Sequence, residues 1–247
     1  MNDLKNNYKL ILAIFIVLLT IFGVYFIYEK LTNNFSQEEI NSIEYSVDNF
    51  PTYNDSILYM YANSSSTDLH SFLNNLSNNH KLLLGGVEEN ISFSTIKNTL
   101  ISKYGTDLDV EAKDYYMFDE DEEPLYILEN GVYIYNENAD ATDYMTELGE
   151  YYLYNYKIKE VKNENNLIAV TYYGLYYQSN FGEENTFYNK DMKLLNKEDK
   201  NNYTYFEFES QIDKYFEVNK DKFVQFKYYL EQKDDNYILK DFKILNK

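Results

Sequence analysis

The chain contains no cysteine, no tryptophan and no arginine, so all 22 of its basic residues are lysines. The absence of cysteine excludes disulfides, thiolate chemistry and the processing of lipoproteins, which modifies a cysteine. Only two histidines and two prolines occur among 247 residues. We find no His-Glu-x-x-His zinc motif, no Gly-x-Ser-x-Gly elbow and no Walker loop. The sequence therefore carries no catalytic or cofactor signature, and we expect no cofactor.

Positive charge is scarce as well, since 41 acidic residues give a formal net charge of −19. Nucleic acid is excluded as a partner, because a polyanion would be repelled and no basic stripe offsets the repulsion. Hydrophobic residues make up 45% of the chain, which is enough for a folded core in spite of the charge. The acidic surface predicts either simple solubility or contact with cations.

The longest run without a charged residue extends from Leu10 to Tyr28. As a helix it would span roughly 28 Å, close to the ~30 Å hydrocarbon core of a bilayer. No small-residue cleavage site follows it, so we predict a retained anchor rather than a cleaved signal peptide. Residues 10–28 are therefore expected to be a single transmembrane helix, with the lipid bilayer as their partner.

The charges beside this run predict its orientation. Lys5 and Lys9 precede it, whereas Lys30 is the only positive residue for more than twenty positions after it. Positive residues favour the cytoplasmic side. We therefore predict a cytoplasmic tail at residues 1–9 and an extracytoplasmic region from residue 29 onward, at the cell membrane.

Residues 29–105 are predicted to be mainly helical and close to the membrane. Ser36 and Glu39 have the spacing of a capping box before an amphipathic run that Pro51 ends. Thr67 and Ser94 are predicted to begin two further helices, and Gly105 stands where a left-handed C-terminal cap is expected.

Residues 106–247 change to a period of two and predict an α+β domain. Asn130-Gly131 is typical of a type I′ turn between two short strands. We expect three hairpins, and thus an antiparallel sheet of about six strands, that a helix near Phe208 to Phe216 covers. Residues 180–202 are expected to be a loop with a short helix near 192–195. The expected strands are residues 125–128, 132–135, 151–161, 167–177, 223–231 and 237–245.

The last hairpin has the sequence Phe223-Val224-Gln225-Phe226-Lys227, followed by Asp235-Asn236-Tyr237-Ile238-Leu239-Lys240. With the anchor, this pattern resembles membrane-anchored extracytoplasmic proteins of low-GC Gram-positive bacteria, some of which have an NTF2-like sheet. The one-span plan also resembles the VirB8-type assembly components of secretion and conjugation machines. The resemblance implies an envelope location but no site residue.

Two groups of residues are candidates for a site. Asp119, Asp121 and Glu123 lie in an acidic run that could bind a hard cation such as Ca²⁺, although Pro124 replaces the glycine that an EF-hand loop needs; a solvated loop is the alternative. Tyrosines on neighbouring strands could form an aromatic binding face for a sugar or a protein. Their alternative role is core packing, because tyrosine favours strands. These residues are Tyr152, Tyr154, Tyr173 and Tyr177.

The sequence thus predicts an envelope binding or scaffold protein with a protein or glycan partner. An anchored hydrolase that acts on glycan or peptide is the alternative, since the members of a catalytic group can meet only in space. A VirB8-like assembly component is a further alternative.

Overall fold

The computed structural model describes residues 35–48, 53–105, 108–116, 123–139, 152–178, 186–192, 205–234 and 236–246. The predicted anchor at residues 10–28 lies outside this part of the chain. Within the described residues, no helix is both long enough and apolar enough to cross a membrane.

The first described part is helical, as predicted. In the capping box, the backbone N–H of Ser36 donates to the Glu39 carboxylate at 2.7 Å, and the Ser36 hydroxyl accepts from the Glu39 N–H at 3.2 Å. Gly105 has the predicted left-handed conformation, with φ of 77°. The helices are α2 (Gln37–Asp48), α3 (Tyr53–Asn63), α4 (Leu69–Asn74), α5 (Asn78–Leu84) and α6 (Phe93–Tyr104).

Two of the predicted helix starts were wrong by one or two residues. Asp68, not Thr67, caps α4 by accepting from the N–H of Ser71. Ser92, not Ser94, caps α6 by accepting from the N–H of Thr95. In both cases two or more residues able to cap a helix stand close together, and the pattern of apolar residues does not choose between them.

The main sheet has five antiparallel strands: β3 (Tyr152–Glu164), β4 (Leu167–Gln178), β5 (Thr186–Tyr188), β6 (Val224–Lys233) and β7 (Asn236–Ile244). Their order is β3-β4-β6-β7, and β5 pairs with β4. The β3–β4 turn is tighter than predicted, because β3 continues to Glu164 and only Asn165 and Asn166 connect the strands, with φ of 52° and 65°. Positive φ at both positions is typical of a type I′ turn.

The three predicted antiparallel hairpins are confirmed, but they do not form one sheet of about six strands. β1 (Tyr126–Glu129) and β2 (Val132–Tyr135) form the expected hairpin, but as a separate sheet. This small sheet lies beside the start of α6. The Asn90 N–H donates to the Tyr133 carbonyl at 2.8 Å, and the Phe93 N–H donates to the Gly131 carbonyl at 2.9 Å. β5 was missed, since it occupies three residues of the predicted loop at 180–202.

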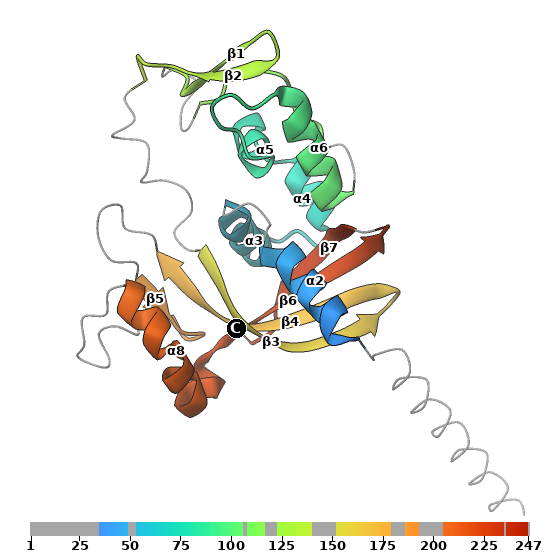
Figure 1. Cartoon of the computed structure of the whole chain (residues 1–247), viewed down its shortest axis with the longest axis vertical. Helices are drawn as coiled ribbons and strands as arrows, with labels where there is room; N and C mark the ends of the chain where they lie inside the picture. Colours follow the sequence, from blue (N-terminus) through green and yellow to red (C-terminus); the bar gives the residue numbers. More distant parts are fainter. Residues whose placement is uncertain are drawn as a thin grey trace, which may run out of the picture.

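The fold is α+β, because the main sheet is antiparallel and most helices precede it in the chain. Helices cover part of both faces of the sheet (Figure 1). Helices α2, α3, α4 and α6 pack with one face, whose buried residues include Tyr172, Phe226 and Tyr228, and α5 packs on α3. Helix α8 (Tyr205–Asn219) and the short 3-10 helix η1 (Lys220–Lys222) lie at the opposite face, where Ile212 joins Tyr173 in a smaller cluster. The prediction that a helix near Phe208 to Phe216 covers the sheet is confirmed.

Candidate functional site

The four predicted tyrosines lie on one face of the β3–β4 hairpin. Tyr152 pairs with Tyr177 across the strands, and Tyr154 pairs with Leu175. Tyr173 lies two positions from Leu175 on β4 and therefore shares its face. The rings of Tyr152 and Tyr177 stack, with centroids 5.1 Å apart and an interplanar angle of 27°. The structure thus brings these side chains together; a binding role for them stays a prediction.

Helix α8 divides this face into a covered part and an open part. Tyr173 is 8% exposed, because Phe216 of α8 packs on it with ring centroids 5.1 Å apart. Tyr152, Tyr154 and Tyr177 are only partly buried. Core packing therefore describes Tyr173. Tyr154 and Tyr177 also pack on Phe187 of β5, with ring centroids 5.7 Å and 5.9 Å apart, but like Tyr152 they keep part of their surface exposed. We call Tyr152, Tyr154 and Tyr177 the open tyrosines.

Sequence reasoning missed Tyr156, which lies where the β3–β4 register shifts. Its hydroxyl donates to the Asp213 carboxylate of α8. Its ring packs against that of Phe216, with ring centroids 5.1 Å apart. Burial, followed by the hydrogen bond to Asp213, raises the pKa of Tyr156. This contact fastens α8 to β3. No signal in the alternation marks the bulge that turns Tyr156 toward α8.

Lysines also surround the covered part of the face. The Lys220 Nζ lies 5.1 Å from the centre of the Tyr173 ring and 5.6 Å from that of Phe216. The Lys159 Nζ lies 5.7 Å from the centre of Tyr173, and the Lys157 Nζ lies 5.9 Å from that of Phe216. We call Lys157, Lys159 and Lys220 the lysine cluster. Lys157 and Lys159 follow the tyrosine run directly, but Lys220 is distant in sequence, and only the packing of α8 unites the three.

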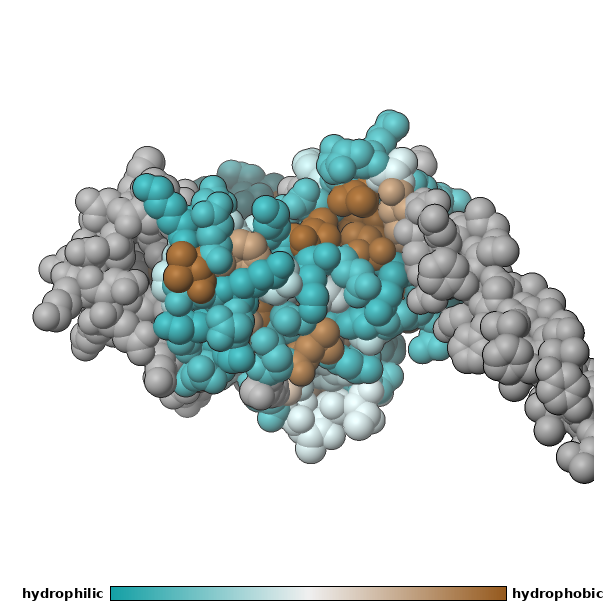
Figure 2. Space-filling model, turned by 90° about the horizontal axis from the view of Figure 1, so that it is seen from below, coloured by the Kyte–Doolittle hydropathy of each residue, from teal (hydrophilic) through white to brown (hydrophobic). Residues whose placement is uncertain are grey.

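Seen from below, the described surface is mainly hydrophilic, and its hydrophobic patches are small and separate (Figure 2). Most buried hydrophobic side chains of the described residues belong to the main core cluster, which includes Phe226, or to the smaller cluster of Tyr173 and Ile212.

The predicted metal candidates are only partly described. Asp119 and Asp121 lie outside the described residues, and Glu123 is exposed. Among the residues that the structure describes, no three His, Cys, Asp or Glu side chains are grouped so that they could hold a metal ion. Binding of Ca²⁺ by the acidic run stays a prediction.

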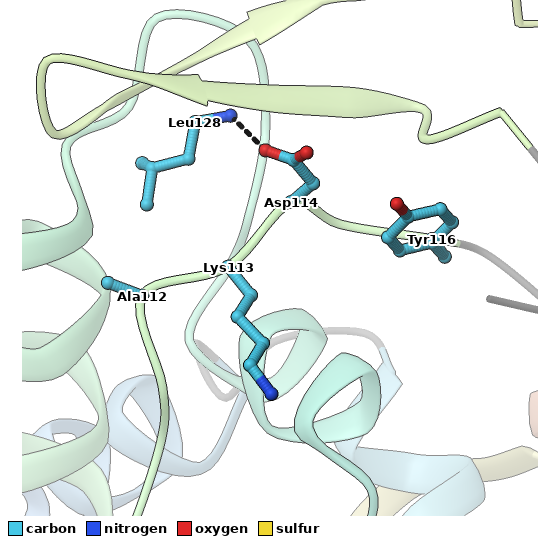
Figure 3. Close-up of a pocket in the computed structure, with 5 residues that line it drawn as sticks. All are labelled: Ala112, Lys113, Asp114, Tyr116 and Leu128. Carbon is cyan, nitrogen blue, oxygen red and sulfur yellow. Dashed lines mark hydrogen bonds between the residues drawn. The ribbon is translucent and has the colours of Figure 1, made fainter.

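A hollow of about 450 Å³ lies beside the extended segment that precedes β1, lined by Ala112, Lys113, Asp114, Tyr116 and Leu128 (Figure 3). The Asp114 carboxylate accepts from the Leu128 N–H at 2.7 Å. Lys113 pairs with Glu111 at 2.6 Å. Both charged groups of this hollow therefore already have partners. It is also open to solvent, so the aromatic face is the better candidate.

No family model, no curated protein and no solved structure matches this chain. The candidate site therefore stands on the arrangement of its own residues.

Proposed function

We propose that the protein is a binding protein of the cell envelope, tethered to the membrane through residues 10–28. Its N-terminus is cytoplasmic and its α+β region is extracytoplasmic in this proposal. The observation that carries the binding role is the stacked pair of Tyr152 and Tyr177, which remains partly exposed at the end of a long hairpin.

The pair is suited to binding because it is ordered before a ligand arrives. Tyrosine has few rotatable bonds, and the two rings already fix each other, so little conformational entropy is lost on contact. Each ring offers an apolar face and a hydroxyl. A sugar ring, with its C–H faces and hydroxyl groups, complements both features. We therefore favour a glycan of the envelope over a protein as the partner.

The test is co-sedimentation of the full chain, in a mild detergent, with insoluble envelope material. The variant carries Tyr152→Ser and Tyr177→Ser, and the control carries Tyr45→Ser, since Tyr45 is 72% exposed on α2. We expect the double variant to bind about tenfold more weakly, as for central aromatic residues of an interface. The control should bind like the unaltered chain. Equal sedimentation of the double variant and the unaltered chain would refute the proposal.

A further inference from the structure

The lysine cluster lies beside the open tyrosines, where β3 passes α8 and η1. Lys157, Lys159 and Lys220 are all exposed. Tyr173 has the Nζ atoms of both Lys159 and Lys220 near its ring, so at most about 11 Å separates these two ammonium groups, comparable to the Debye length of ~8 Å at physiological ionic strength. The cluster is therefore a local concentration of positive charge.

No carboxylate neutralises this cluster within the described part of the chain. Lys159 donates to the Gln225 side-chain oxygen at 2.8 Å, and none of the three lysines forms an ion pair with a described carboxylate. Nearby acidic groups do exist: Asp213 accepts from Tyr156, and Glu217 is exposed on α8. Although the chain has a net charge of −19, no carboxylate among the described residues forms an ion pair with these lysines.

A second lysine and aromatic group provides an internal comparison. The Nζ atoms of Lys227 and Lys243 lie 5.1 Å and 5.0 Å from the centre of the Tyr229 ring. Here the charge is neutralised, because Lys227 pairs with Glu164 at 2.5 Å and Lys243 with Asp241 at 3.2 Å. The two groups share their chemistry and differ in their counter-ions. Among the described residues, the lysine cluster has no such counter-ion, so its charge is available to a ligand.

We propose that the lysine cluster binds the acidic groups of an anionic carbohydrate polymer whose sugar rings contact the open tyrosines. This inference rests on the proposed function and narrows its ligand. Tyr173 and Tyr177 are four positions apart on β4, which is about 13 Å along a strand. A ligand that meets both the lysines and the stacked pair is therefore longer than a single sugar.

The net charge of the protein favours a narrow polymer over a flat anionic membrane. Charges interact strongly only within about one Debye length, ~8 Å. A polymer strand approaches only the surface along which it lies, so it meets the lysines and avoids most carboxylates. A bilayer brings negative charge to a whole side of the acidic protein and is repelled.

The experiment measures binding of the full chain, held in phosphatidylcholine nanodiscs, to defined probes. Polygalacturonate supplies carboxylates, poly(glycerol phosphate) supplies phosphates, and dextran of matched length is the neutral probe. Vesicles of phosphatidylglycerol test the membrane directly. The variant carries Lys157→Gln, Lys159→Gln and Lys220→Gln. The matched control removes the same charge elsewhere, at the exposed residues Lys113, Lys233 and Lys240.

We expect the full chain to bind one or both anionic polymers and not to bind dextran. The affinity of the cluster variant for the anionic polymer should be lower by about tenfold or more, as for the loss of three exposed charge contacts. The control should retain its affinity. Equal binding by the cluster variant, equal loss in the control, or binding to the vesicles but to neither polymer would overturn the inference. If the cluster variant still sediments with envelope material as the unaltered chain does, the proposed function stands and this inference fails. The lysines are exposed, but the variant loses their contacts with Gln225, Tyr173 and Phe216, so the melting temperature should fall by only a few degrees. A single cooperative unfolding transition serves as the folding control.

Discussion

Tyr172 and Tyr228 are neighbouring core tyrosines that differ in the hydrogen bonding of their hydroxyl groups. Their rings are 5.6 Å apart at 80°, and their exposed fractions are 2% and 1%. The Tyr228 hydroxyl donates to the Asn155 side-chain oxygen at 3.0 Å. The Tyr172 hydroxyl has no hydrogen-bond partner among the described residues. Removal of the Tyr228 hydroxyl should therefore lower stability, whereas removal of the Tyr172 hydroxyl should raise it.

The expected magnitudes follow from the two environments. Tyr228→Phe removes a hydrogen bond and leaves the Asn155 oxygen without this donor, so the free energy of unfolding should fall by about 1 to 2 kcal/mol. Tyr172→Phe removes a hydroxyl that is desolvated without compensation, so the free energy of unfolding should rise by about 1 kcal/mol. For a domain of this size, each kcal/mol shifts the melting temperature by roughly 2 to 4 °C.

The assay is thermal unfolding of the full chain followed by far-ultraviolet circular dichroism, because the chain has no tryptophan to report fluorescence. Burial, followed by the charges of Asp48 and Glu44, raises the pKa of Tyr172, so its hydroxyl stays protonated at neutral pH. Tyr45→Phe at an exposed position should leave the melting temperature unchanged. If Tyr172→Phe lowers the melting temperature as much as Tyr228→Phe does, the reasoning is refuted.

Three further predictions use the same unfolding measurement. Ser36→Ala removes the capping box of α2 and should lower the free energy of unfolding by about 1 kcal/mol; no change would show that the cap is dispensable. Gly174→Ala should cost about 1 to 3 kcal/mol by overpacking, because a Cβ atom there would lie 2.3 Å from Phe226 and 2.6 Å from the Tyr154 carbonyl oxygen; a stabilised variant would contradict this. Burial acts to raise the pKa of Glu164, but hydrogen bonds from Lys227 and Lys162 outweigh it, and the net shift is downward from 4.5. A lowered pKa contributes stability above the pKa of the unfolded chain, and this stability is lost as pH falls through the folded value. Glu164→Gln should therefore be less stable at neutral pH and lose less stability below pH 4.5, and an unchanged acid profile would argue against the ion pair.

The local signals predicted most elements but missed α3, α5 and β5, and they predicted the assembly of the elements less well. Asn130-Gly131 marked its hairpin because few residues accept positive φ, and the spacing of Phe208 to Phe216 marked α8. Pairing of hairpins into sheets depends on contacts between residues distant in sequence. For this reason the sequence did not show that β1 and β2 pair with each other beside α6 and stay apart from the main sheet, or that β5 joins β4.

The candidate site was predictable in the same partial way. Alternation along β3 and β4 places Tyr152, Tyr154, Tyr173 and Tyr177 on one face, as the register confirms. The lysine cluster was not predictable, because it depends on how α8 crosses the hairpin and on two register shifts in β3. Nothing in the sequence near Lys220 indicates that its ammonium group lies near Tyr173.

The most direct test of a binding role for this face is a footprint of the lysines. The full chain is acetylated with and without isolated envelope material, and each lysine is quantified by mass spectrometry. We expect Lys157, Lys159 and Lys220 to be protected, and Lys113, Lys233 and Lys240 to react equally in both samples. Protection confined to the second group, or absent from the first, would contradict the account.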